Sequence, residues 1–299
     1  MVWQSVGVGY ARNVVDHFVL KGVNRDKMEK IKVELGEVQK TLLLPLWGRA
    51  VESQKEDPRL VDGMAVEIIN KIDYDFTTIT KNISWLSQFS WVVRSLHVDK
   101  IILEFIKNNP KATIVNIGCG LDTTFERIDN GQILFYDLDL PDVINLRKNF
   151  FQENERRKTI SSSLFEDKWL SQLQIKDGIL FIAAGVFYYF DENQMKDFFI
   201  LIADHFPGCE IFFDSASSLG VKVANKKVLK NVGMDETAIL KWGIKSAKLI
   251  KKWDNRIQLV EEFPMFEGMK TGLPFKMKYG LWMSDLFKIM SMIHLRIGK

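Results

Sequence analysis

Residues 112–142 read ATIVNIGCGLDTTFERIDNGQILFYDLDLPD, and this stretch decides the fold of the 299-residue chain. Its first part, 113–117, is a short apolar and β-branched run, which is typical of a buried parallel strand. A turn with two glycines follows at 118–120, and glycine lets a backbone turn tightly against a ligand because it has no Cβ. Helical spacing over 122–128 and a second apolar run over 132–137 complete a strand–turn–helix–strand unit.

Acidic residues close the second strand of this unit. Asp137, Asp139 and Asp142 stand about 20 residues after the glycine turn, which is the spacing of a nucleotide-binding unit in a doubly wound sheet. In such a unit the turn meets the cofactor and a carboxylate binds the two ribose hydroxyls. The alternative is an ordinary turn between a strand and a helix, in which the glycines only allow the backbone to turn tightly and bind no ligand.

The turn differs from a dinucleotide site at two positions. Thr123 occupies the place of the third glycine in G-x-G-x-x-G, and the acid Asp122 stands beside the turn. An acid at this place disfavours a pyrophosphate through like-charge repulsion. A cofactor with a positive centre and no phosphate is compatible with it, and S-adenosylmethionine meets both conditions.

The run NIGCGLDTTFERI, followed by YDLDLPDVI, resembles the leucine carboxyl methyltransferase family, in particular its bacterial branch that acts on small molecules. The resemblance extends from Met28 to the C-terminus. Further matching runs are VELGEVQKTLLLPLWGRA at 33–50, IDYDF at 72–76, SLFEDKW at 163–169, FIAAGVFYYF at 181–190, KWGI at 241–244 and HLRIGK at 294–299.

This resemblance implies an α/β fold of the S-adenosylmethionine-dependent methyltransferase class, with a Rossmann-like sheet of seven mostly parallel strands. It places a helical cap at 28–110 and a methyltransferase domain at 111–299, with a helical insertion at 217–252 before the last two strands. Residues 1–27 precede the match, and Met28 could serve as a start codon. We therefore expect an upstream extension of weak order, with a short helix over 10–20 as the alternative.

The alternation of apolar and amphipathic segments after residue 111 supports the α/β assignment. Helices are also expected through 36–109, and they include an amphipathic helix at 62–71 and an aromatic-rich one at 83–108. Strands are expected near 113–117, 132–137, 159–162, 178–184, 209–215, 256–263 and 292–297. Helices in this part are expected near 122–128, 141–157, 191–206 and 283–291.

Composition narrows the class of protein. The 41 basic and 38 acidic residues are spread along the chain, whereas a nucleic-acid partner needs clustered basic residues. The longest apolar run, 179–190, is too short to span a bilayer, and no charged leader precedes an apolar stretch. Cys119 and Cys209 make no disulfide framework, and no metal-ligand spacing occurs. We expect a cytoplasmic protein with a small-molecule partner, no metal, no nucleic acid and no membrane.

The resemblance assigns cofactor roles to individual residues. Asp139 matches the family's ribose-binding acid and Asp137 is its rival; one of the two would cap the helix near Pro141. Arg94 matches the arginine that pairs with the cofactor carboxylate, although it could be a surface residue, and Arg49 is a second candidate. The expected cofactor-binding set is Arg94, Gly118, Cys119, Gly120, Asp122, Asp139, Leu140, Ser163, Leu164, Ala184 and Gly185.

Ala184 departs from the family pattern, which often has Glu at this position, so any contact of a carboxylate there is in doubt. No catalytic base is assigned. The candidates for the acceptor pocket are Tyr188, Tyr189 and His97, while His205 is expected to end a helix. The expected reaction is methyl transfer to a carboxylate or phenolic oxygen. A nicotinamide-dependent oxidoreductase and a non-catalytic cofactor-binding relative remain as alternatives.

Overall fold

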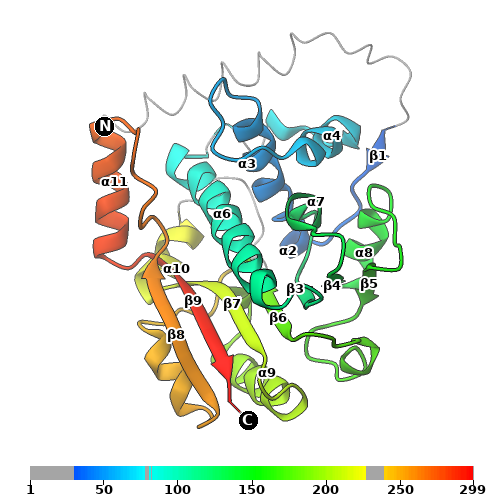
Figure 1. The fold of residues 1–299 in the computed structure, drawn as a ribbon. Coiled ribbons are helices and arrows are strands. Elements are labelled where there is room, and N and C mark those ends of the chain that lie inside the picture. The colour runs from blue at the N-terminus through cyan, green and yellow to red at the C-terminus, as the bar shows by residue number, and fades with distance from the viewer. Residues whose placement is uncertain (1–29, 78–80, 82, 227–238, 299) are drawn as a thin grey trace.

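The computed structural model describes residues 30–77, 81, 83–226 and 239–298 (Figure 1). The expectations for 1–27, including a helix over 10–20, lie outside these residues. Within the described part, no helix is both long enough and apolar enough to cross a membrane. The same residues contain no cluster of His, Cys, Asp and Glu that could hold a metal ion.

A seven-stranded sheet forms the centre of the molecule, with strand order β5-β4-β3-β6-β7-β9-β8. Neighbouring strands from β5 to β7 are parallel, and β9 runs antiparallel to both β7 and β8. The strands are β3 (Thr113–Ile117), β4 (Leu134–Asp139), β5 (Arg157–Ser161), β6 (Ile179–Ala183), β7 (Glu210–Ala216), β8 (Ile257–Pro264) and β9 (Met290–Ile297). All seven expected strands are therefore present, and the predicted fold class is confirmed.

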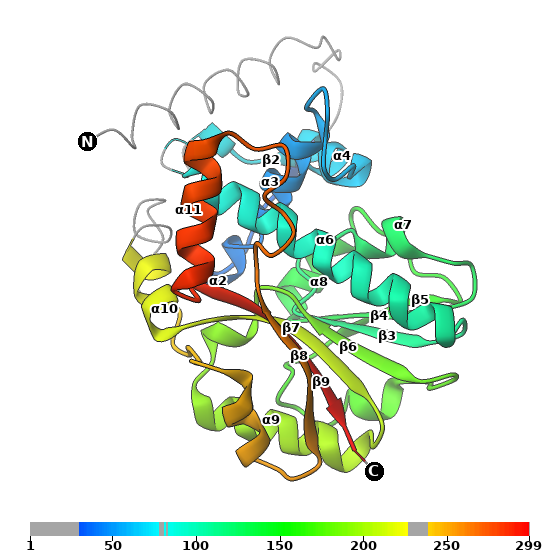
Figure 2. The ribbon, with the colours of Figure 1, turned by 60° about the vertical axis from the view of Figure 1, so that its left-hand side comes forward.

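Helices cover both faces of this sheet, which explains why the central strands are apolar on both sides. The long helix α6 (Trp85–Asn108) lies on one face and α9 (Glu192–His205) on the other (Figure 2). Every residue of β3 and β6 is buried. Two separate clusters of buried side chains result, one on each side of the sheet.

The region before the sheet is helical, as expected. It contains α2 (Glu37–Lys40), α3 (Leu43–Ser53), α4 (Gly63–Lys71) and α6. The side chain of Asp62 caps α4 by accepting from the Ala65 N–H. Helices α3 and α4 pack on each other and on the end of α8 (Pro141–Arg147). A two-stranded parallel sheet, which the sequence did not suggest, pairs β1 (Ile31–Lys32) at the start of this region with β2 (Ile72–Asp73) directly after α4.

Two predicted helices are wrong in extent. Helix α8 ends at Arg147 and does not continue to 157, because the Asn149 side chain donates to the last helical carbonyls, those of Asn145 and Leu146. The helix expected at 283–291 is instead α11 (Phe275–Leu286). It ends where Lys288 adopts a φ of 47°, which an α-helix cannot contain.

The insertion at 217–252 is only partly helical. Its described residues include α10 (Ser218–Ala224) and the short 3-10 helix η7 (Ala247–Lys252). Residues 239–246, directly before η7, are not helical. The Ser217 side chain caps α10 by accepting from the Gly220 N–H. Helix α10 packs against β7, so the insertion lies at the carboxyl edge of the sheet, where ligands bind in this class of fold.

Candidate active site

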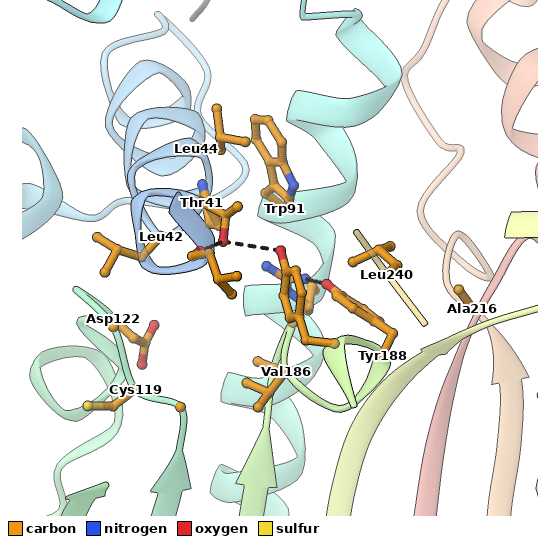
Figure 3. Close-up of a pocket in the computed structure, with 18 of the residues that line it drawn as sticks. Thr41, Leu42, Leu44, Trp91, Cys119, Asp122, Val186, Tyr188, Ala216 and Leu240 are labelled. Atoms are coloured by element: carbon orange, nitrogen blue, oxygen red, sulfur yellow. Dashed lines mark hydrogen bonds between the residues drawn. The ribbon is translucent and has the colours of Figure 1, made fainter. Parts of the chain in front are cut away.

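A cavity of about 570 Å³ lies at the carboxyl ends of the central strands. Its floor includes the turn after β3, the end of β4 and the residues after β6. The segment from α2 to α3 covers it from above, and Leu42, Leu44 and Trp91 line that side (Figure 3). Residues of α10 and of the start of β9 line the far end. This volume suits a ligand the size of a cofactor together with a small acceptor.

The glycine turn takes a backbone conformation that other residues rarely adopt. Gly118 and Gly120 have φ angles of 62° and 48°. A Cβ at Gly118 would lie 2.5 Å from Cγ2 of Val186, closer than any real contact. The Gly118 and Cys119 N–H groups both donate to the carbonyl of Leu138, which fixes the turn on the neighbouring strand.

Asp139 stands beside this turn with both carboxylate oxygens engaged. Its Oδ2 accepts from the Gly120 N–H at 2.7 Å, and its Oδ1 accepts from the Leu140 N–H at 2.8 Å. Burial raises the pKa of Asp139 to about 6, although these two N–H donors act in the opposite direction. Each oxygen keeps a lone pair that a hydroxyl group could approach from the cavity.

Asp137, the rival acid, occupies a different environment. Its side chain is fully buried and accepts from Arg147 Nη2 at 2.8 Å and from Arg157 Nε at 3.1 Å. It does not line the cavity, so its position is that of a structural counter-ion. Neither acid caps α8, whose N-cap residue is Leu140, so that expectation is wrong.

Asp122 faces the cavity beside the turn (Figure 3). Its Oδ2 accepts from the Asn116 side chain and from the Thr124 N–H, both at 3.1 Å. Burial acts to raise the pKa of Asp122, but the charges of Arg49 and Arg127 outweigh it and hold this pKa well below its ordinary value. The carboxylate of Asp122 is therefore ionised at neutral pH.

Arg94 lies inside the molecule, so the surface alternative is wrong. From α6, its Nη1 donates to the Tyr188 hydroxyl at 3.1 Å and to Asp214 Oδ2 at 3.2 Å. Burial acts to lower the pKa of Arg94, but the charge of Asp214 more than compensates and raises it. The guanidinium is therefore charged at neutral pH. Nη1 is the only nitrogen of the Arg94 guanidinium that donates to a described residue. Arg94 also lines the cavity.

Nothing in the sequence places Asp214 at the site, because it is an acidic residue within the otherwise largely apolar strand β7. Its side chain is completely buried, and its second oxygen accepts from the Gly185 N–H at 2.6 Å. Gly185 has a φ of 83°, and a Cβ there would lie 2.7 Å from Arg94 Nη1. Asp214 therefore ties the arginine to the residues that follow β6, which include the cavity residue Ala184.

The aromatic run after β6 is a 3-10 helix, η3 (Phe187–Tyr189), rather than a continuation of the strand. Phe187 enters the core, whereas Tyr188, Tyr189 and Phe190 line the cavity. The Tyr189 hydroxyl donates to Thr41 Oγ1 at 3.1 Å, which links this helix to the covering segment (Figure 3). Burial raises the pKa of both tyrosines, so both hydroxyls stay protonated.

The histidine candidate is not at the site. His97 Nε2 contacts the Met265 carbonyl at 2.8 Å, and its ring packs edge-on against Phe263, away from the cavity. Burial lowers the pKa of His97, in keeping with a core residue. His205 ends α9 with its Nδ1 at 2.9 Å from the Leu201 carbonyl, as expected.

The other expected residues reach the cavity from separate elements. Arg49 lines it too, but its Nε is paired with Asp62 and its Nη2 donates to the Leu121 carbonyl, so its direction is fixed. All eleven expected cofactor residues line the same cavity. They are Arg94, Gly118, Cys119, Gly120, Asp122, Asp139, Leu140, Ser163, Leu164, Ala184 and Gly185.

Comparison with known proteins gives a consistent assignment. The model of the family described as leucine carboxyl methyltransferase matches residues 43–203. The tetracenomycin polyketide synthesis O-methyltransferase TcmP of Streptomyces glaucescens is 26% identical, over 79% of this chain and 86% of its own. The S-adenosyl-L-methionine-dependent methyltransferase dpfgK of Gibberella zeae is 28% identical, over 70% of this chain and 78% of its own.

Solved structures agree on the fold. A protein from Thermobifida fusca assigned as a methyltransferase has a TM-score of 0.55 at 14% identity, covering 94% of this chain and 100% of its own. A DUF574 family protein from Streptomyces avermitilis has a TM-score of 0.56 at 8% identity, covering 86% of this chain and 97% of its own.

Proposed function

Because the chain belongs to the leucine carboxyl methyltransferase family, we propose that it transfers the methyl group of S-adenosylmethionine to an oxygen of a small-molecule acceptor. It is an S-adenosylmethionine-dependent methyltransferase; the chemical nature of the acceptor is the proposal. The observation that carries it is one cavity that joins the glycine turn and Asp139 at one end to Arg94 and two tyrosines at the other.

The residues fit the cofactor. The ribose hydroxyls would donate to Asp139, whose oxygens each have a remaining lone pair. The cofactor carboxylate would lie against Arg94, whose Nε and Nη2 are not engaged by described residues. The adenine edge would meet Ser163 and Leu164 in the loop after β5. The ionised Asp122 beside the turn favours a positively charged cofactor over a pyrophosphate.

The environment of the acceptor favours a carboxylate over a phenol. A carboxylate is already ionised at neutral pH, whereas a phenol with a pKa of about 10 gains from a base. The cavity tyrosines stay protonated, and Asp214 is held in an ion pair with Arg94. The Tyr188 hydroxyl accepts from Arg94, so its own proton is free to be donated to an acceptor oxygen. Among the described residues, the side chains around η3 thus offer hydrogen-bond donors rather than an unpaired base, which suits an anionic acceptor.

The chain's contribution to the reaction is alignment and exclusion of water. The cofactor supplies an activated methyl group, and its transfer to oxygen is an in-line displacement. Arg94 would hold the cofactor carboxylate and Asp139 the ribose, so that the sulfur would lie between these two contacts. The segment from α2 to α3, linked to η3 through Thr41 and Tyr189, covers the reacting centre.

Titration calorimetry of the full chain with S-adenosylmethionine, S-adenosylhomocysteine and NAD tests the cofactor. We expect the first two to bind and NAD to give no heat. A panel of small carboxylic acids and phenols, incubated with methyl-labelled cofactor, then tests the acceptor. Labelled methyl esters support the proposal. Labelled phenyl ethers with no esters would contradict the preference for a carboxylate.

Binding of S-adenosylhomocysteine should depend on pH through Asp139. The pKa of this carboxyl is raised to about 6 in the free protein, so it is ionised above this pH and protonated below it. An ionised carboxylate is the stronger acceptor for ribose hydroxyls. We expect a constant Kd from pH 7 to 8 and a rise of up to about ten-fold per unit as the pH falls below 6. The Asp139→Asn variant should bind more weakly at pH 7 and show no such rise; a parallel rise in both proteins would assign the effect to another group.

A further inference from the structure

The outer face of α11 is apolar and exposed. Phe275, Tyr279, Trp282 and Leu286 are 82%, 50%, 51% and 57% exposed. Their spacing places them in one row along the helix, because side chains four, seven and eleven positions apart share a face. We call these four residues the α11 row. Both views show α11 at the edge of the molecule, beside α10 and outside the sheet (Figures 1 and 2).

The opposite face of the same helix attaches it to the protein. Leu281 and Ser284 are buried, and Ser284 lines the cavity. The Lys270 side chain pairs with Asp285 and thereby fixes the loop before the helix. The row is therefore presented by a helix that is already held in place, so that binding through the row needs little further ordering.

The row is larger than the isolated apolar residues that ordinary surfaces carry. An aromatic side chain buries roughly 150–250 Å² when it is fully covered. The side chains of the row are at least half exposed, so the row presents an apolar area on the order of 400 Å². Patches of this size on a monomer commonly mark a contact surface. Phe287, the C-cap residue of α11, is also exposed, at 53%.

Charges at the borders of the row indicate its partner. Lys276 and Lys278 are exposed, and at 100° per residue they fall on opposite sides of the row. Lys288 is exposed just beyond its end. The single acid of the helix, Asp285, is already engaged by Lys270 and by the Phe266 N–H. The apolar row is thus bordered by lysines, and α11 has no unpaired acidic side chain that could neutralise them.

We propose that the α11 row is a docking surface for an anionic lipid membrane, in contrast to the expectation from the sequence that the protein has no membrane partner. Aromatic and leucine side chains with lysines at their borders are typical of helices that lie in a membrane interface, where tryptophan and tyrosine are favoured and lysine contacts the headgroups. This contact differs from spanning, for which the helix is far too short. A second copy of the chain fits less well, because pairing two rows would bring their lysines together without a free acid.

Docking in this way would place the membrane beside the wall of the cavity to which Ser284, on the inner face of α11, contributes. The inference rests on the surface alone, however, and does not depend on the proposed reaction.

Sedimentation of the full chain with vesicles tests this proposal. We expect binding to vesicles of equal parts phosphatidylglycerol and phosphatidylcholine, weak binding to pure phosphatidylcholine, and release by salt. Phe275→Ser with Trp282→Ser, and separately Lys276→Glu with Lys278→Glu, should each weaken binding about ten-fold or more. Neither pair lines the cavity, so the affinity for S-adenosylhomocysteine should be unchanged, which also shows that the variants are folded.

Two matched controls separate position from composition. Leu103→Ser removes an apolar side chain that is 43% exposed on α6, and Lys158→Glu with Lys196→Glu makes the same change in net charge at exposed sites elsewhere. Both should bind the anionic vesicles like the unmodified chain. Equal losses in the controls, or no binding of the unmodified chain, would overturn the proposal. A dimer in analytical ultracentrifugation that Phe275→Ser with Trp282→Ser dissociates, without vesicle binding, would assign the row to a second copy instead.

Discussion

Asp137→Ala should lower the free energy of unfolding by about 3–5 kcal/mol, because it leaves two buried guanidinium groups without their shared counter-ion. Asp137 is fully buried between Arg147 and Arg157. Arg157 keeps Glu126 as a second counter-ion, but Asp137 is the only carboxylate paired with Arg147 among the described residues. Nε of Arg147 and Nη2 of Arg157 already have no hydrogen-bond partner in this part of the chain. Denaturant unfolding followed by circular dichroism measures the loss.

The matched control is Asp129→Ala, which removes the carboxylate of a surface ion pair between Asp129 and Arg156. Asp129 and Arg156 are partly exposed, and pairs of this kind contribute about 0–1 kcal/mol. Asp139→Ala completes the comparison: it should weaken S-adenosylhomocysteine binding by roughly 1–3 kcal/mol with a smaller change in stability. An Asp137→Ala protein of unchanged stability that no longer binds S-adenosylhomocysteine would show that Asp137, not Asp139, contacts the ribose.

Arg94→Ala should weaken S-adenosylhomocysteine binding by about 1.5–3 kcal/mol, or roughly ten-fold to 150-fold in Kd. The guanidinium is the cation that we propose for the cofactor carboxylate, and it is held inside the cavity by Asp214. Arg94→Lys keeps the charge but loses the planar fork, so it should recover only part of the affinity. Calorimetry measures all three proteins, with Lys100→Ala, at an exposed site on the same helix, as the control.

Asp214→Asn examines how the arginine is held. The change keeps an oxygen for the Gly185 N–H but removes the negative charge that faces Arg94. We expect an affinity between those of wild type and Arg94→Ala, together with a lower melting temperature. If Arg94→Ala binds S-adenosylhomocysteine as tightly as wild type, the arginine serves only its ion pair with Asp214, and Arg49 becomes the better candidate for the cofactor carboxylate.

The sheet could be predicted from the sequence because its central strands β3, β4 and β6 are short apolar runs, each followed within two residues by glycine or ended by an acid. The glycine turn and Asp139 were predictable for the same reason, since a single local unit from β3 to β4 contains both. Asp214 was not, because its partner Arg94 is 120 positions away and β7 gives no sign that one of its residues faces a cation. His97 was misassigned because a lone histidine in a helix shows nothing of its surroundings.

Helix α11 was misplaced for a different reason. Its exposed face is as apolar as its buried face, so no alternation of polar and apolar residues marks its limits. The start signal was Pro274, which stands at the N-cap position just before Phe275. The end of α8 likewise depends on a side-chain contact of Asn149 that the pattern of apolar residues does not encode.

The position of Cys119 has a consequence for the chemical safety of the site. A sulfonium methyl donor is an alkylating agent, and a thiolate is the most reactive nucleophile that a protein could place near it. Cys119 lines the cavity within the glycine turn. Burial, reinforced by the acids Asp137 and Asp139, raises the pKa of the Cys119 thiol well above its ordinary range despite the nearby Arg147. The sulfur therefore keeps its proton at neutral pH and is a poor nucleophile, so we expect no methylation of Cys119 by the cofactor.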